Sequence, residues 1–218
     1  MGNENINKTI EFLKEQYEKS EYYKSNKIDK DYRFEHTLRV TNIGIEIAKK
    51  ENLDVEALAL GCLLHDVSYM NNFNSEEDWL NHGRNSAKIA RPYLESLGLA
   101  KEKTDEICYG IAIHVDDKAD FEGERTPLAI SVGDADNIDR FDPYRIYETL
   151  QHVKFNEKEL HEKIEYVERN LEKLNKYMNM ELGTVTAKIM WKDKIGFQIL
   201  FFRRLEKQLK NGNHVSME

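Results

Sequence analysis

Apolar residues recur at helical spacing along much of this 218-residue chain, and few helix-ending residues interrupt them. The sequence contains only 3 Pro and 11 Gly. Sandwiches and barrels need many tight turns, which are built largely from these two residues. The chain is also long enough to bury a sizeable core without a disulfide or metal staple. These features predict an all-α protein.

The predicted helices cover residues 8–23, 34–50, 55–66, 86–97, 104–114, 127–140, 156–178 and 184–210. Residues 25–31 are expected to form a non-helical break between the first two predicted helices. Pro92 lies inside a predicted helix, so we expect a kink or a boundary there, because an interior proline removes a hydrogen bond. The last residues, 211–218, are predicted to be a frayed tail. The two long charged helices near the C-terminus are expected to cover the core or to form a homodimer face.

Charge and composition argue against several classes of protein. The chain has 32 Lys+Arg against 40 Asp+Glu, a formal net charge of −8. A nucleic acid is therefore not expected as its main partner, since phosphate binders present a basic face. No window approaches the length of a membrane span, and the N-terminus lacks the apolar stretch of a signal peptide, so no membrane partner is expected. Cys62 and Cys108 are too few for a disulfide framework and fit a reducing cytoplasm.

His65 and Asp66 stand at the end of the apolar run LALGCLLHDV, where both side chains would be buried. A carboxylate buried beside an imidazole costs much desolvation free energy unless something compensates it. A bound cation does so, since imidazole nitrogens and carboxylate oxygens are ordinary metal ligands and one carboxylate can bridge two ions. A hydrogen-bonded His-Asp pair is the other explanation. These two residues alone leave both interpretations open.

Four more residues that could bind metal lie on or beside other predicted helices: His36, His82, His114 and Asp136. Each also has a purely structural explanation, such as the favourable position of His114 at a helix C-terminus. Together with the His-Asp pair they make six potential ligands on separate helices. That set indicates a metal cluster inside a helical bundle.

At these residues the chain resembles the HD-domain superfamily of metal-dependent phosphohydrolases, whose signature is a His, then a His-Asp pair, then a distant Asp. The matching residues are His36 in FEHTLRV, His65 and Asp66 in LLHDV, and Asp136 in DADNID. The resemblance covers about residues 30 to 150, the size of a domain. It implies a compact HD-domain helical bundle with an N-terminal helix. The expected organisation is a single domain, 1–218, with a metal-binding core at 30–150 and a C-terminal helical extension at 151–218.

Two further histidines, in NHGRNSAKIA and AIHVDD, look like those of the family's binuclear members. The resemblance then implies one or two divalent ions (Mn, Mg, Co, Ni or Fe), with Asp66 as the bridging and catalytic residue. The implied ligands are His36, His65, Asp66 and Asp136 for one ion, and Asp66, His82 and His114 for the other.

Asp134 is a rival for the last ligand position. Asp134 and Asp136 are two positions apart, and on a helix such residues point about 200° apart. Only one of them would therefore face the site. We prefer Asp136 because the family pattern is Ala-Asp followed by a variable and then an apolar residue, as in Ala135 to Ile138.

Metal ions of this kind would lower the pKa of a bound water and accept phosphoryl oxygens. The expected substrate contacts are Arg39, Arg84, Lys118 and Asp139, with Lys88, Arg125 and Arg140 as further candidates. The structural explanation, a solvated surface charge, is the commoner one for each of the cations, and Asp139 and Arg140 could instead cap the helix. Arg84 is the favoured phosphate ligand.

Some features depart from known branches of the family. Val67, Ser68 and Tyr69 follow the His-Asp pair, without the lysine of the HD-type cyclic dinucleotide phosphodiesterases, and the Gly-Tyr-Pro signature of those enzymes is absent. A synthetase domain like that of the stringent-response hydrolases is absent too. The sequence therefore favours a stand-alone phosphohydrolase of a nucleotide or another small phosphate ester or anhydride. Two alternatives stay open: an HD-type di-iron oxygenase of a small alcohol or phosphonate, and a non-catalytic metal-bound sensor or scaffold.

Overall fold

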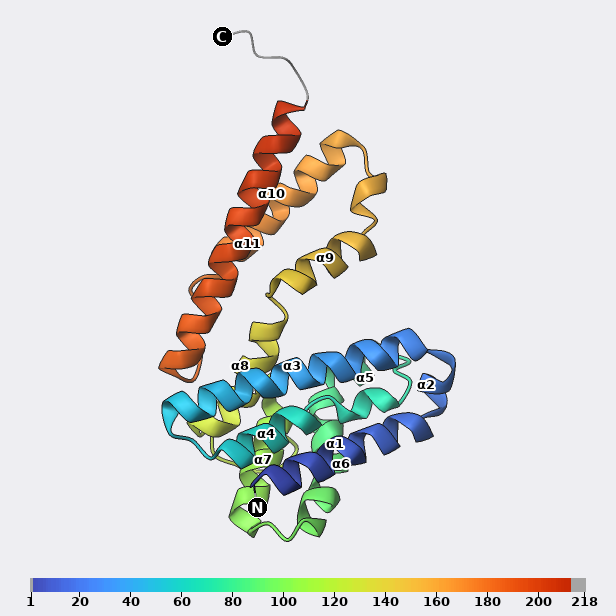
Figure 1. Ribbon diagram of the computed structural model, residues 1–218, viewed down its shortest axis with the longest axis vertical. Coiled ribbons are helices and arrows are strands. Elements are labelled where there is room, and N and C mark those ends of the chain that lie inside the picture. Colours follow the sequence, from blue (N-terminus) through green and yellow to red (C-terminus); the bar gives the residue numbers. More distant parts are fainter. Residues whose placement is uncertain (1, 213–218) are drawn as a thin grey trace. The chain divides into compact units, whose positions relative to one another are not determined.

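The computed structural model describes residues 2–212, which form eleven α-helices and two short 3₁₀ helices and contain no strand (Figure 1). The all-α prediction is confirmed. The helices before the chain's midpoint are α1 (Gly2–Lys19), α2 (Glu21–Ser25), α3 (Lys27–Glu51), α4 (Val55–Leu64), η1 (Val67–Met70), α5 (Glu76–Leu80) and α6 (His82–Ser96). The later ones are α7 (Lys101–Ile113), α8 (Pro127–Asp139), α9 (Pro143–His152), η2 (Phe155–Glu157), α10 (Leu160–Tyr177) and α11 (Val185–Asn211).

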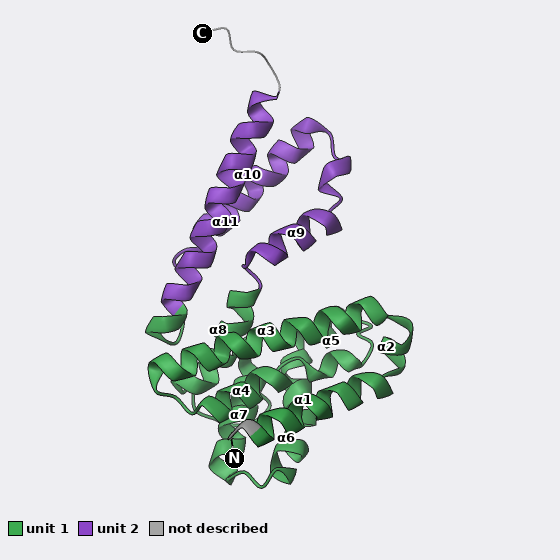
Figure 2. Ribbon diagram, viewed as in Figure 1, with its two compact units in different colours: residues 1–139, 182–187 green, residues 140–181, 188–218 purple. Residues whose placement is uncertain are grey.

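The chain divides into two compact units (Figure 2). Unit 1 comprises residues 1–139 and 182–187, and unit 2 comprises residues 140–181 and 188–218. The predicted single domain, with its core at 30–150 and its extension at 151–218, is a different division and stays a prediction. Most of the predicted tail, including His214, lies outside the described residues.

Helix α4 forms the centre of unit 1. All residues from Ala57 to Leu64 are buried, including the free thiol of Cys62. A helix that is apolar on every side must be surrounded, and α4 packs against α1, α3, α7 and α8. Its N-terminus is capped by the Asp54 carboxylate, which accepts a hydrogen bond from Ala57 N at 3.0 Å. The helix therefore ends in the interior, where His65 and Asp66 follow it.

The predicted break over residues 25–31 is wrong, and of the two alternatives expected at Pro92 the helix boundary is excluded. Only Asn26 separates α2 from α3, so the expected break over residues 25–31 is a single residue. This segment has no Pro or Gly, and Asp29 in the first turn of α3 favours helix through its interaction with the helix dipole. Helix α6 continues through Pro92 to Ser96. Its buried face, which includes Ala90, packs closely on α7 and offsets the lost hydrogen bond.

Unit 2 contains α9, η2, α10 and the part of α11 from Lys188 onward. Its core contains the Trp191 ring, whose Nε1 donates a hydrogen bond to Tyr177 O at 2.7 Å. The Phe141 ring packs edge-on against Trp191 with 4.7 Å between centroids. Lys194 Nζ pairs with the Asp142 carboxylate at 2.5 Å. The C-terminal helical extension thus has a hydrophobic core of its own.

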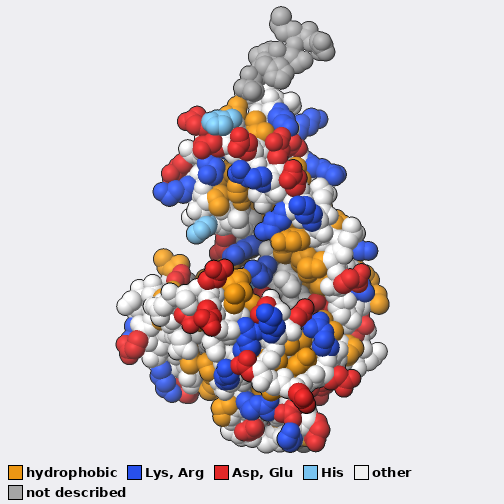
Figure 3. All heavy atoms as spheres, turned by 180° about the vertical axis from the view of Figure 1, so that it is seen from behind, with side chains coloured by type: hydrophobic (Ala, Val, Ile, Leu, Met, Phe, Trp, Pro, Cys, Tyr) orange, Lys and Arg blue, Asp and Glu red, His pale blue; other side chains and the backbone are white. Residues whose placement is uncertain are grey.

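Charged side chains of both signs lie interspersed over the face drawn in Figure 3, without a large region of one sign. Within the described residues, no helix is both long enough and apolar enough to cross a membrane.

Candidate metal centre

The six predicted ligands meet inside unit 1, although they come from five different helices or helix ends. They are His36 in α3, His65 and Asp66 after α4, His82 at the start of α6, His114 after α7, and Asp136 in α8. Their ligand atoms form three overlapping groups, and within each group all atoms lie within 4.8 Å of one another. Such groups of imidazoles and carboxylates could hold metal ions.

Asp66 stands at the centre, with its two oxygens facing different pairs of histidines. Asp66 Oδ2 is 3.7 Å from His36 Nε2 and 3.3 Å from His65 Nε2. Asp66 Oδ1 is 3.3 Å from His82 Nε2 and 3.5 Å from His114 Nε2. The carboxylate is therefore placed as a bridge between two groups of ligands would be. Burial raises the pKa of the Asp66 carboxyl, but neighbouring His65 and Arg33 hold it well below its ordinary value.

Three of the histidines are held by their second ring nitrogen. In each, Nδ1 bonds the backbone carbonyl three residues earlier, and the pairs are His65 with Cys62, His82 with Trp79, and His114 with Ile111. A carbonyl only accepts hydrogen bonds, so Nδ1 must carry the hydrogen. In the neutral ring, Nε2 then presents a lone pair to the centre. This arrangement fixes both tautomer and orientation, as outer partners of metal-binding histidines do.

The resulting cluster contains more acceptors than donors. His82 Nε2 and His114 Nε2 lie 3.1 Å apart, and both face Asp66 Oδ1. Asp66 Oδ1 and His65 Nε2 are buried and have no hydrogen-bond partner. Facing lone pairs without a hydrogen between them are unfavourable in a water-poor interior. A cation fits this donor set because it would satisfy the facing atoms together.

Asp136 and Asp134 have different surroundings. Asp136 Oδ1 lies 3.2 Å from His36 Nε2 and groups with His65 and His114. Asp134 Oδ2 instead accepts a hydrogen bond from Gly183 N at 2.8 Å. The structure thus brings Asp136 into the cluster and gives Asp134 a bond to the segment before α11.

Asp139, expected to contact substrate, lies behind His36. Its carboxylate accepts hydrogen bonds from His36 Nδ1 at 2.7 Å and from Arg39 Nε at 2.8 Å. Burial lowers the pKa of His36, but hydrogen bonds to the Asp136 and Asp139 carboxylates outweigh it and raise that pKa to about 9. Asp139 therefore orients the His36 ring, and Arg39 supports Asp139.

The candidate cations in α6 and in the loop after α7 pair with nearby aspartates. Arg84, whose side chain is 11% exposed, donates to Asp116 at 2.7 Å and also bonds Asn81. Lys118 is exposed and lies 3.9 Å from Asp116. Among the described residues, Arg84 and Lys118 form no ion pair with Asp66 or Asp136 of the metal cluster. Lys88 and Arg125 similarly pair with Asp120 and Asp117.

Arg33 is a functional candidate that the sequence analysis missed. Its guanidinium donates to Asp66 Oδ2 and lies 3.6 Å from the centroid of the Tyr69 ring. Burial lowers the pKa of Arg33, but Asp66 outweighs it and raises the pKa above its ordinary value. Arg33 stands three residues before His36, a spacing that places both on one face of α3. This spacing in the sequence could have identified Arg33 as a neighbour of the metal ligands.

Gly83 allows α6 to approach α7 closely beside two of the ligands. A Cβ atom at this position would lie 2.8 Å from Ala112 O and 3.0 Å from His114 Nδ1. Any larger residue would therefore push apart the helices that carry His82 and His114.

Three aromatic rings lie near His82. The centroids of Tyr69, Phe73 and Trp79 lie 5.0, 6.3 and 5.9 Å from that of His82, respectively. Tyr69 and Phe73 also contact each other, and Trp79 is 45% exposed. These residues form an aromatic group that reaches from the buried cluster to solvent.

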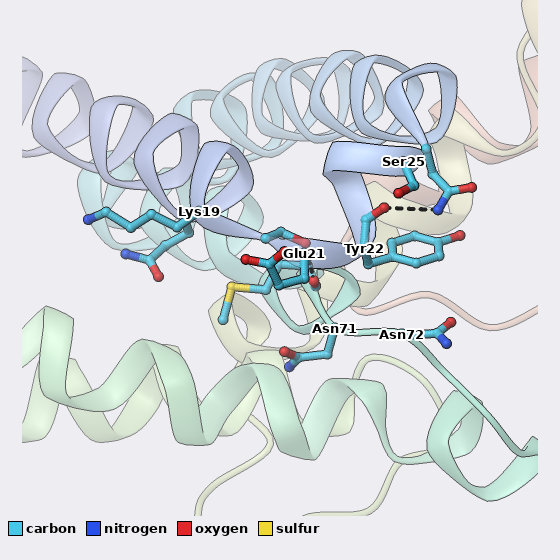
Figure 4. Close-up of a pocket in the computed structure, with 10 residues that line it drawn as sticks. Lys19, Glu21, Tyr22, Ser25, Asn71 and Asn72 are labelled. Carbon is cyan, nitrogen blue, oxygen red and sulfur yellow. Dashed lines mark hydrogen bonds between the residues drawn. The ribbon is translucent and has the colours of Figure 1, made fainter.

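A separate hollow of about 610 Å³ lies between the α1–α2 region and the segment after η1. In Figure 4, Glu21 and Tyr22 lie on one side of it, and Asn71 and Asn72 face them from the other. Its lining is polar and includes none of the six ligands. The metal centre is therefore not part of this hollow.

The chain was compared with protein families and known proteins. The family model described as the HD domain matches residues 33–141, half of the chain. A predicted HD superfamily hydrolase from an uncultured Thermotogales bacterium is similar in structure, with 19% identity and a TM-score of 0.62 over 93% of this chain and 91% of that one. An HD-superfamily hydrolase from Bacillus thuringiensis has 21% identity and a TM-score of 0.68 over 96% and 99% of the two chains. No curated protein matches the sequence.

Proposed function

The chain belongs to the HD-domain family, and from this premise we propose that it is a metal-dependent phosphohydrolase of a nucleotide or another small phosphate ester or anhydride. The observation that carries the proposal is the convergence of four imidazole Nε2 atoms on the two oxygens of Asp66. This donor set suits one or two divalent ions such as Mn, Mg, Co, Ni or Fe.

The six candidate ligands form two sets that share Asp66, and each set could hold one ion. One ion would be held by His36, His65, Asp66 and Asp136, and the other by Asp66, His82 and His114. Bound there, divalent ions lower the pKa of a coordinated water and polarise phosphoryl oxygens. The chain's own contribution is to fix the ligands: backbone carbonyls hold three of the rings, and Asp139 holds the ring of His36.

Arg33 would supply positive charge on the substrate side of this centre. Its guanidinium already lies against the Asp66 carboxylate and is supported by the face of the Tyr69 ring. Arginine is well suited to phosphate because its planar donors match two oxygens at once. Arg33 contacts the central carboxylate, whereas Arg84 is held by Asp116 and Asn81 and pairs with no acid of the cluster, so Arg33 is the better candidate for the phosphate contact.

The aromatic group beside His82 favours a nucleotide among small phosphate compounds. A nucleobase stacks on aromatic faces, and such stacking contributes about 1–3 kcal/mol per base. Trp79 is the exposed member of the group, while Tyr69 and Phe73 are half-buried and contact each other.

The reaction is tested by measuring phosphate release from a panel of nucleotides and simple phosphate esters with each divalent metal in turn. We expect metal-dependent release that is abolished by chelation and restored by metal. Two equivalents of bound iron with no phosphate release would overturn the hydrolase and favour the di-iron oxygenase. Bound metal with neither activity would favour a sensor.

The nucleotide preference has a separate readout, because Trp79 and Trp191 are the only two tryptophans. In a Trp191→Phe variant, the fluorescence reports Trp79 alone. Adenosine monophosphate should quench this fluorescence at lower concentration than ribose 5-phosphate, which lacks a base. The matched control is Trp79→Phe, in which only Trp191 fluoresces, and the quenching by adenosine monophosphate should be lost. Equal responses to the two compounds would contradict base stacking.

A further inference from the structure

One face of α11, within unit 2, carries a row of exposed residues. The row consists of Ile189, Asp193, Phe197, Leu200 and Arg204, and we call it the α11 row (α11 is red in Figure 1). Spacings of four, four, three and four place these residues on one side of a helix. Ile189 is 65% exposed, Phe197 46% and Leu200 48%. Aligned exposed apolar side chains of this size mark an interaction surface.

The two charges of the α11 row also lack partners. Three lysines of the helix are paired: Lys188 with Glu181, Lys194 with Asp142, and Lys210 with Glu168 and Glu206. Asp193 and Arg204, like Lys192, Arg203 and Lys207, make no ion pair with any residue that the structure describes. They lie about 16 Å apart along the helix, at a rise of about 1.5 Å per residue, and are too distant to pair with each other.

Four residues of the α11 row are placed symmetrically about the midpoint between Gln198 and Ile199, and Ile189 has no apolar counterpart. Phe197 and Leu200 are equally far from this midpoint and are both apolar. Asp193 and Arg204 are also equally far from it and have opposite charges. A contact between two copies related by a two-fold axis must be self-complementary in this way.

We propose that the α11 row binds the same row of a second copy of this chain, with the two helices antiparallel and the two-fold axis at this midpoint. Phe197 then packs on Leu200 of the partner subunit, and Asp193 pairs with Arg204 of the partner subunit. Each contact occurs twice. Gly196, beside the row, has no atom within 4 Å of where its Cβ would stand, so the second helix can approach closely.

The contact is tested by sedimentation velocity of the full chain from dilute to concentrated protein. The wild-type chain should dimerise. Asp193→Arg or Arg204→Asp alone should weaken the dimer about tenfold or more, because each replaces two attractive pairs with two repulsive ones. The double variant should recover the dimer, since its pairs are merely reversed.

Lys192→Asp is the matched control, because Lys192 is exposed, adjacent in sequence and about 100° away around the helix. It should dimerise as the wild type does. All these residues are exposed, and unchanged circular dichroism and metal content would show that unit 1 is intact. A wild-type chain that stays monomeric at every concentration would overturn the proposal. So would single variants that dimerise normally, or a double variant as weak as the single ones.

Discussion

Histidines of units 1 and 2 have contrasting environments. In unit 1, four histidines are buried or nearly so, and each is fixed through Nδ1 by a carbonyl or by Asp139. In unit 2, His152 and His161 lie exposed on helices α9 and α10. The same residue type is therefore a constrained ligand candidate in one unit and a solvated surface residue in the other.

The contrast shows which property marks a functional imidazole. Burial of a polar ring is unfavourable unless both nitrogens have partners. For His65, His82 and His114 the protein supplies a carbonyl partner for Nδ1 and leaves Nε2 facing Asp66, and Nε2 of His65 has no hydrogen-bond partner. The missing partner, rather than the histidine itself, is the evidence for a cation. The following predictions test this contrast, from the largest expected effect to the smallest.

Replacing Asp66 by Ala should have the largest effect, because both groups of ligands share this carboxylate. We expect loss of metal from the purified protein and loss of phosphate release. Metal content by mass spectrometry and activity on the same sample provide the measurement. If Asp66→Ala keeps its full metal content, the bridging role is wrong.

Asp136→Asn and Asp134→Asn should differ sharply. The first change removes a charged oxygen that lies 3.2 Å from His36 Nε2, so metal content should fall. The second keeps an acceptor for Gly183 N, so metal should stay bound. The reverse pattern in metal analysis would transfer the ligand role to Asp134.

Asp139→Asn should weaken metal binding by about 10- to 100-fold, as loss of an outer partner of a ligating histidine typically does. The His36 ring loses the carboxylate that holds its Nδ1. A competition titration with a chelator measures the change. Asp142→Asn, which affects only the pair with Lys194 in unit 2, is the control and should bind metal normally.

The metal-free protein should lose stability as the pH rises from about 6.5 to 9. The pKa of His36 is about 9 in the folded chain, above the ordinary value of 6.5. A raised pKa stabilises the folded state fully below pH 6.5, and this stabilisation, on the order of 3 kcal/mol, is lost as pH rises through 9. Urea unfolding of chelated protein across this range provides the measurement. A flat profile would mean that His36 is not held as an imidazolium.

His161→Ala should change neither metal content nor activity, and its stability should stay within about 0.5 kcal/mol of the wild type. The same is expected for His214→Ala, although His214 lies outside the described residues. A large loss of metal in either variant would break the distinction between the two kinds of histidine.

The sequence predicted the helical fold and the six residues that meet at the centre, because ligand types and their order along the chain are local features. It did not predict which side chains lie behind them. Asp139 and His36 are 103 residues apart, and only the packing of α8 on α3 brings them together. Arg84 looked suitable for phosphate from its position beside His82, yet the loop after α7 supplies Asp116 to it.

The helix boundaries illustrate the same limit. Pro92 is unfavourable inside a helix on local grounds, but burial of the α6 face against α7 outweighs that local cost. Likewise the aromatic group beside His82 joins η1, the loop after it and α5, which have no common periodicity in the sequence. Tertiary contacts decided both features.

The central claim is that the histidines around Asp66 hold divalent ions. Elemental analysis of the wild-type protein, purified without added metal or chelator, tests it most directly, with phosphate release measured on the same sample. One or two equivalents of a divalent metal, together with metal-stimulated phosphate release, is the predicted result. Protein that contains no metal, and binds none when titrated with Mn, Mg, Co, Ni or Fe, would contradict the claim.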